Sequence, residues 1–398
     1  MVEFAVLRRR LLQGFVIVWF VGLLLPNISL PNEKENAVNI NKENRKITPF
    51  PSLNLIDKRF YTDLEKFYQD RLFGRENLIY AWSKLNYKCN VMLDEEYVKG
   101  KKGWLFRKKH TIKAFNDKEL KLKKIKIIQN YCKIHDVDFI FIVPPYKNAV
   151  YSNLLPEKIR TSAPAYNKIE NDLINSCKNL KINYLSLYKP LLKSKKLFPN
   201  DIYWWDDHHW SYEGASIAAD TVLKYIKTKK SDFIYDSMPF DGTYKNGRKE
   251  TSMVSALGVR DLGSGYTKVP WSKQFTDQIY GVDQYTSKQV QFKNEPISNH
   301  YILEKTIKGE CLIFNKTTKN NFKILFLCDS YGGNMTTYMS QFVPYMINTH
   351  YLRKTGKKNN TDLKKLIKKY HPDIVILEIG APEFFNSKGD TYLKHIVF

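Results

Sequence analysis

The sequence DFIFIVPP occupies residues 138–145, and KILFLCDS (323–330) and HPDIVILEIG (371–380) repeat its uninterrupted apolar run. A strand buried on both faces has this pattern, because helices cover a parallel sheet on both sides. Between these runs, apolar residues recur at the spacing of a helix, at about 165–181 and again over 212–229. Strands that alternate with helices predict an α/β fold with a mostly parallel sheet.

Other segments complete this outline of the fold. INYLSL (182–187) is a further expected strand, and residues 61–85 predict two helices that meet near Gly74. A Lys-rich helix of roughly a dozen residues is expected between the last two strands. Residues 231–320 carry short polar and aromatic runs with glycine-containing turns, which indicates an irregular or β-rich insertion.

The N-terminus predicts export. Three arginines (8–10) precede an apolar stretch from Leu11 to Leu25, and no small-residue cleavage site follows. A secretory signal peptide shares this pattern, but the missing cleavage site favours an uncleaved signal anchor with the rest of the chain outside the cytoplasm. The expected organisation is therefore an anchor over 1–26, a polar linker over 27–52 and a catalytic domain over 53–398.

The composition limits the partners. Hydrophobic residues make up 43% of the 398 residues, which excludes a disordered protein, and the formal net charge is +24. Such a charge attracts polyanions, and export makes nucleic acid an unsuitable one. An acidic polysaccharide or a membrane surface is the expected partner. The five cysteines have no CxxC spacing and indicate neither a metal site nor a disulfide framework.

The stretch YWWDDHHWSYE (203–213) has three interpretations: a metal site, the acid-base half of a nucleophilic triad, or a packed aromatic loop. Metal is the weakest of them, because no distant His or Asp cluster stands out to complete a coordination shell. In an extended segment Asp207 and His209 share one face, and Asp206 and His208 share the other. The spacing by itself leaves both pairs open.

A nucleophile for such a triad is available at Ser330, where the strand over 323–330 ends before two glycines. Ligands of parallel sheets bind at the carboxyl ends of the strands. A serine at this position needs a histidine to activate it as a nucleophile. The plainer interpretation is a serine that caps a helix. Backbone N–H groups of Ser330 and Gly332 are candidate oxyanion donors. Asn148, Asn334 and Trp210 are further candidate contacts to the oxyanion or substrate.

The order of several motifs resembles the SGNH-hydrolase-like O-acetyltransferases of bacterial exopolysaccharide export, including the alginate acetylation proteins and the related DHHW proteins. The matches extend from about residue 43 to 385. The sequence departs from the family pattern at two places: Cys328 stands where the family usually has glycine, and IGAPEFF lacks the family's E-R ending. The matching blocks are ENRKITPFPSLN, FYQDRLFGRENLI, GKKGWLF, VPPYKNAVYSNLLP, DHHWSYEGA, CDSYG and HPDIVILEIG.

This resemblance implies a three-layer, flavodoxin-like, circularly permuted SGNH fold. It implies Ser330 as nucleophile, His209 as general base and Asp207 as the carboxylate that orients it, without a metal or cofactor. The expected protein is a single-pass protein of the inner membrane with a periplasmic domain. It would acetylate a cell-surface or secreted polysaccharide and take acetyl from a multispanning membrane acyltransferase. An acetyl esterase with the same triad and a non-catalytic assembly or binding protein are the alternatives.

Overall fold

The computed structural model divides the chain into two compact units, residues 1–93 with 253–263 and residues 94–252 with 264–398. The expected boundaries at residues 26 and 52 stay predictions. The residues that the structure describes are 13–14, 48–53, 57–71, 75–89, 96–112, 114–161, 165–195, 201–248, 253, 266–275, 279–282, 289–291, 310–350, 361–387 and 393–397.

The smaller unit contains helices α3 (Lys58–Arg71) and α4 (Arg75–Lys88), which confirms two helices that meet near Gly74. Asp70 of α3 accepts the backbone N–H of Thr48 at 2.8 Å. The predicted anchor from Leu11 to Leu25 lies, except for residues 13 and 14, outside the described residues. Within the described ranges no helix is both long and apolar enough to span a membrane.

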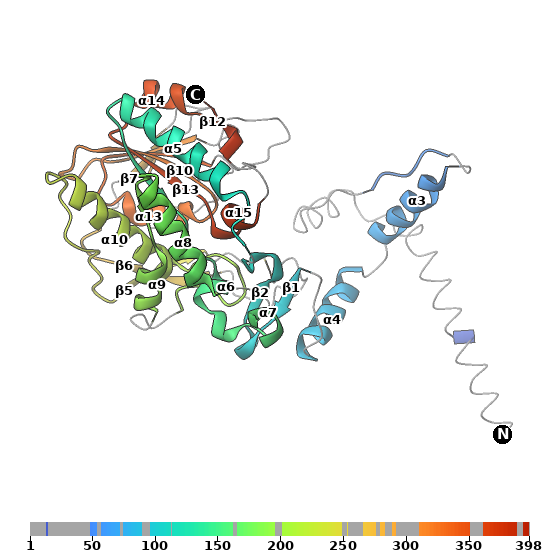
Figure 1. Cartoon of the computed structure of the whole chain (residues 1–398). Coiled ribbons are helices and arrows are strands. Elements are labelled where there is room, and N and C mark those ends of the chain that lie inside the picture. The colour runs from blue at the N-terminus through green and yellow to red at the C-terminus, as the bar shows by residue number, and fades with distance from the viewer. Residues whose placement is uncertain are drawn as a thin grey trace. The chain divides into compact units, whose positions relative to one another are not determined.

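An eight-stranded sheet forms the centre of the larger unit, in the order β4-β3-β13-β10-β11-β9-β7-β8 (Figure 1). The first five of these strands pair in parallel, and the last three join in antiparallel pairs. Their bounds are β3 (Asp138–Ile142), β4 (Tyr184–Leu185), β7 (Ile279–Val282), β8 (Gln289–Gln291), β9 (Glu310–Asn315), β10 (Lys323–Cys328), β11 (Tyr345–His350) and β13 (Ile374–Glu378).

The sheet is therefore mixed: its five parallel strands agree with the expected parallel sheet, and its antiparallel strands lie in the expected β-rich insertion over 231–320. Strands β7, β8 and β9 of the insertion extend the parallel sheet at one edge. The insertion also forms a separate two-stranded antiparallel sheet, β5 (Thr243–Arg248) with β6 (Tyr266–Trp271). Strand β11 pairs in parallel with β10, although only a helix was expected in the chain between β10 and β13.

Helices pack against this sheet, and Figure 1 shows α5 and α8 lying over its strands. Helix α8 confirms the helix expected at 165–181, and α10 has the bounds expected for it. The helices are α5 (Lys118–Ile134), α6 (Lys147–Val150), α7 (Glu157–Thr161), α8 (Tyr166–Asn179), α9 (Tyr188–Ser194), α10 (Tyr212–Lys229), α13 (Gly332–Met339), α14 (Leu363–Tyr370) and α15 (Ala381–Asn386).

The core explains why the three apolar runs become neighbouring strands. Residues 324–328 of β10 and 374–378 of β13 are buried without interruption, as are 139–142 of β3. Each fully buried aliphatic or aromatic side chain contributes about 1.5–3 kcal/mol relative to an exposed one. Because β3, β13 and β10 are parallel neighbours, the segments that follow them meet at the carboxyl ends of these strands.

Candidate active site

The stretch YWWDDHHW folds as a closed loop beside helix α10. Tyr203 and Trp210 form an antiparallel bridge, and the Ser211 N–H donates to the Ile202 carbonyl at 3.0 Å. The Ser211 hydroxyl caps α10 by accepting the Gly214 N–H at 3.3 Å. Gly214 has to be glycine, because a Cβ there would lie 2.2 Å from the Ile202 carbonyl oxygen. The first turn of α10 thus fixes the position of the loop.

The loop places His209 between a carboxylate and a hydroxyl. His209 Nδ1 lies 2.7 Å from Asp207 Oδ1, and its Nε2 lies 2.8 Å from Ser330 Oγ. Asp207 Oδ1 also accepts the backbone N–H of His209 at 2.8 Å. Asp207 is fully buried and His209 is 7% exposed. These are the distances and the order that general-base activation of a serine needs.

The distances to Asp207 show which of the two histidines pairs with it. His208 Nδ1 lies 3.6 Å from Asp207 Oδ1, almost an ångström farther than His209 Nδ1. Burial lowers the pKa of His208 well below its usual range, and His209 lowers it further, so His208 is neutral at pH 7. Asp207, His208 and His209 are close enough to offer ligands to one metal ion. Both ring nitrogens of His209 already have hydrogen-bond partners, which favours the triad over the metal site.

The segment that carries Ser330 is held by its preceding residue. Asp329 accepts the N–H of Tyr331 through Oδ1 and the N–H of Gly380 through Oδ2, each at 2.8 Å. Gly332 approaches β10 so closely that a Cβ would lie 2.4 Å from Cβ of Cys328. A glycine is therefore required where α13 begins. This packing positions Ser330 at the carboxyl end of β10.

The other predicted site residues have different surroundings. The Gly332 N–H already donates to the Asp329 carbonyl at 3.3 Å, and Asn334 lies buried in the first turn of α13. Trp210 Nε1 donates to the Tyr331 carbonyl at 3.1 Å, so it joins the histidine loop to the serine segment. The Asn148 amide donates to the Arg107 carbonyl and to Thr111 Oγ1, both at 3.1 Å. The roles of all four in binding an oxyanion or substrate stay predictions.

A buried lysine also holds the histidine loop, and its role was missed in the sequence. The Lys147 ammonium donates to the carbonyls of Trp204 (3.0 Å), Trp205 (3.2 Å) and Asp207. Lys147 is 1% exposed and follows β3 at the sheet edge. A lysine just beyond a buried strand could have suggested this position, because β3 ends beside the strands that carry the triad.

Replacing Lys147 with methionine should remove this donor from the buried carbonyls of Trp204 and Asp207, whereas the Trp205 carbonyl keeps the N–H of Leu105 at 2.8 Å. We expect a loss of about 3 kcal/mol in the free energy of unfolding, since each unpaired buried group costs about 1–3 kcal/mol. Displacement of the loop should also lower turnover of an acetyl ester by about 100-fold. Denaturant unfolding and ester turnover measure the two effects.

The matched control is Lys121→Met. The Lys121 ammonium donates to the carbonyls of Asn116, Phe384 and Ser387 at 2.6–2.8 Å, away from the histidine loop. This variant should lose comparable stability while it retains most of its turnover. Equal losses of turnover in both variants would show that Lys147 acts only through stability.

A second group of titratable side chains lies behind the triad. The Tyr146 hydroxyl makes a short hydrogen bond to Glu383 Oε2, and the Asp329 N–H donates to Glu378 Oε2 at 3.0 Å. Burial raises the pKa of Glu378 well above its usual range, and the neighbouring Asp329 adds to the shift. Burial likewise raises the pKa of Glu383 to about 7, again with help from Asp329. Glu383 therefore titrates near neutral pH.

Glu383 should make stability depend on pH. A carboxyl whose pKa rises from 4.5 to about 7 on folding stabilises the fold fully below pH 4.5, and this contribution is lost as the pH rises through 7. The variant Glu383→Gln lacks this loss and keeps an acceptor for Tyr146. Its free energy of unfolding relative to wild type should rise by about 3 kcal/mol between pH 4.5 and pH 8. Denaturant unfolding across this pH range measures the difference.

The control variant is Glu157→Gln, which removes a carboxylate that is 82% exposed on α7. It should follow the wild-type stability profile throughout. Parallel profiles for Glu383→Gln and wild type would contradict the assignment of this pH dependence to Glu383.

Comparison with known proteins agrees with this architecture. Residues 97–283 match the family model of the SGNH hydrolase-like domain of the acetyltransferase AlgX. The resemblance read from the sequence is thereby confirmed, and the larger unit has an SGNH-hydrolase-like α/β fold with a mixed sheet. None of the curated proteins matches this chain.

Two solved structures share the fold at low sequence identity. PatB1 of Bacillus cereus, solved with a sulfonyl adduct, has a TM-score of 0.52 and 17% identity, over 73% of this chain and 97% of that one. A DHHW family protein of Eubacterium siraeum has a TM-score of 0.53 and 17% identity, over 75% and 94% of the two chains. These similarities concern the fold. They leave the circular permutation a prediction.

Proposed function

We propose that this chain is an extracytoplasmic polysaccharide O-acetyltransferase that acts through an acetylated Ser330. The observation that carries the proposal is the chain of contacts from Asp207 through His209 to Ser330, at 2.7 and 2.8 Å. The match of residues 97–283 to an acetyltransferase domain supports acetyl as the group transferred. The apolar stretch from Leu11 to Leu25 behind three arginines supports an inner-membrane anchor and a periplasmic domain.

In the first half-reaction His209 Nε2 takes the proton of Ser330 Oγ, which attacks the carbonyl carbon of an acetyl donor. The carbonyl oxygen becomes an oxyanion, for which backbone N–H groups around Ser330 are the proposed donors. The bond from the acetyl carbon to the donor's leaving group then breaks, and His209 returns the proton to that group. Acetyl-Ser330 results.

In the second half-reaction a sugar hydroxyl gives its proton to His209 and attacks the acetyl carbon. The bond to Ser330 Oγ breaks, and Oγ recovers the proton from His209. Asp207 keeps Nδ1 of His209 protonated and stabilises the imidazolium in both steps. A multispanning membrane acyltransferase is the proposed donor, because acetyl coenzyme A is confined to the cytoplasm.

The experiment that tests the proposal separates transfer from hydrolysis. The purified protein is incubated with an activated acetyl ester and an exopolysaccharide, and free acetate and acetylated sugar are both measured. A transferase should give mainly acetylated sugar, at a rate that rises with sugar concentration. Free acetate as the main product at saturating sugar would identify an esterase, and no product of either kind would indicate a binding protein.

A further inference from the structure

Tyr331, which follows Ser330 in sequence, contacts three successive residues of the histidine loop. Its hydroxyl donates to the His208 carbonyl at 2.7 Å, and its carbonyl accepts from Trp210 Nε1 at 3.1 Å. Its ring lies against that of His209, with 5.0 Å between the ring centroids and an interplanar angle of 51°. One residue thereby joins the loop that carries the general base to the segment that carries the nucleophile.

The imidazole of His209 needs a neighbour that sets its plane. The outer torsion of a histidine side chain is broad, so the side chain does not fix the orientation of its own ring. Asp207 accepts from Nδ1 at 2.7 Å, but this single contact still lets the ring tilt. A catalytic group has to be held within about 0.5 Å and 10–20° of its productive geometry. The rings packed against His209, those of His208 and Tyr331, therefore have to supply the missing constraint.

The Tyr331 ring is itself held in one orientation. It is fully buried, meets the Trp210 ring edge to face at 5.0 Å and stacks on the Tyr146 ring at 4.8 Å and 23°. The Tyr146 hydroxyl is in turn hydrogen-bonded to Glu383. Burial raises the pKa of Tyr331 well above its usual range, so its hydroxyl stays a donor to the loop at neutral pH. A side chain locked by packing and hydrogen bonds can fix the position of a neighbour.

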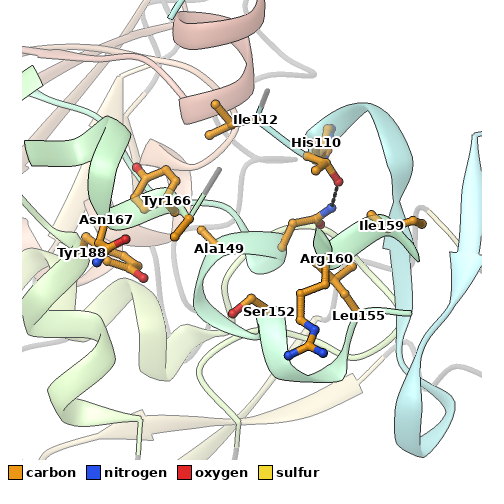
Figure 2. A pocket seen from close by; sticks show the side chains of 13 residues that line it. His110, Ile112, Ala149, Ser152, Leu155, Ile159, Arg160, Tyr166, Asn167 and Tyr188 are labelled. Carbon is orange, nitrogen blue, oxygen red and sulfur yellow. Dashed lines mark hydrogen bonds between the residues drawn. The ribbon is translucent and has the colours of Figure 1, made fainter. Parts of the chain in front are cut away.

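His110 extends this aromatic packing beyond Tyr146. The two rings meet edge to face, with 4.4 Å between centroids, and the His110 ring lies 5.1 Å from that of His208. Figure 2 shows His110 in the wall of a cavity of about 260 Å³, and no triad residue is among the described residues that line it. The contacts that reach His209 are therefore those of the packed rings.

We propose that Tyr331 is a positioning residue for acetyl transfer, whose ring holds the His209 imidazole in the plane in which Nε2 meets Ser330 Oγ. The proposal rests on the proposed function, because it concerns the general base of the same triad. Tyr331 is fully buried, so it acts through His209 and not by contact with a substrate. Its loss should therefore lower kcat and leave KM nearly unchanged.

The test replaces Tyr331 with leucine and with phenylalanine in the purified protein. Turnover of an activated acetyl ester and the rate at which a fluorophosphonate labels Ser330 are both measured. Tyr331→Leu removes the ring, so kcat and the labelling rate should each fall by about 100-fold, as expected of a displacement of about 1 Å. Tyr331→Phe keeps the ring and loses one hydrogen bond, so both rates should stay within about tenfold of wild type. KM should change by less than about twofold in both variants.

The matched controls are Tyr338→Leu and Tyr338→Phe. Tyr338 is also a fully buried tyrosine whose hydroxyl donates to a backbone carbonyl, that of Pro270 at 3.2 Å, and it lies near the end of α13. These variants should lose stability comparable to that of the Tyr331 variants, while kcat stays within about threefold of wild type. All rates are measured well below the unfolding temperature of every variant, and Tyr331→Met replaces Tyr331→Leu if the latter does not fold.

The outcomes separate the positioning role from the proposed reaction. Equal losses of kcat in the leucine variants of Tyr331 and Tyr338 would reduce Tyr331 to a structural residue and overturn the proposal. A Tyr331→Phe variant as slow as Tyr331→Leu would overturn the role of the ring. Wild-type protein whose Ser330 is labelled but which transfers no acetyl would contradict the proposed function, while the labelling rates still decide the positioning role. Wild-type protein that is not labelled at Ser330 would overturn both.

Discussion

The variant Ser330→Ala should lose acetyl transfer by a factor of about 10⁴ to 10⁶ while it keeps its fold. Alanine removes the Oγ that lies 2.8 Å from His209 Nε2, and no acetyl-serine can form without it. The side chain is small, and the segment around it is held through the backbone of Tyr331 and Gly380 by Asp329. Stability should therefore change little. Initial rates of sugar acetylation and thermal unfolding measure the two quantities.

The control for this variant is Ser216→Ala, because Ser216 is a fully buried serine in α10 whose hydroxyl donates to the Glu213 carbonyl at 2.7 Å. It loses one hydroxyl from the core and leaves the triad intact, so its rate should stay close to that of wild type. A rate for Ser330→Ala within tenfold of wild type would remove Ser330 from the mechanism.

The variant Asp207→Asn should lower the rate by about 10⁴-fold, because it changes the tautomer of His209. Asp207 Oδ1 accepts from both Nδ1 and the backbone N–H of His209, at 2.7 and 2.8 Å. An asparagine can turn its amide group toward Nδ1 and leave the proton on Nε2. The imidazole then has no lone pair directed at Ser330. Rates of ester turnover over a range of pH measure the loss.

The matched control is Asp206→Asn, since Asp206 is equally buried and adjacent in sequence. The same isosteric change at this position should alter the rate by less than tenfold. If Asp206→Asn proved the more damaging of the two variants, the carboxylate behind His209 would have been assigned to the wrong residue.

The parallel half of the sheet could be predicted from sequence because burial on both faces produces long apolar runs. The β3 and β10 strands show this clearly, with four and five consecutive buried residues. Strand β11 was missed because YMINTH mixes apolar residues with Asn348 and Thr349, which are buried inside. Asn348 is tolerated there because Cys328 Sγ donates to its Oδ1 and its amide donates to Thr336. Such compensation depends on residues distant in sequence.

The candidate triad was predictable for a similar reason. Two-residue spacing left two acid–histidine pairs open, and the family resemblance selected Asp207 with His209. The end of a buried strand placed Ser330 at the carboxyl end of the sheet. The groups around the triad were not predictable, because Lys147 and His110 lie about 60 and 100 residues before the histidine loop. Their contacts with this loop arise from the packing of α6 and of the segment after β2 (Leu105–Arg107).

The most direct measurement is mass spectrometry of the protein quenched during turnover with an acetyl ester. The account predicts a single peptide that gains the mass of one acetyl group, with the group on Ser330, and no such peptide in His209→Gln. An acetyl group found on another side chain, or wild-type protein that turns over rapidly without any acetylated peptide, would contradict covalent catalysis by this serine.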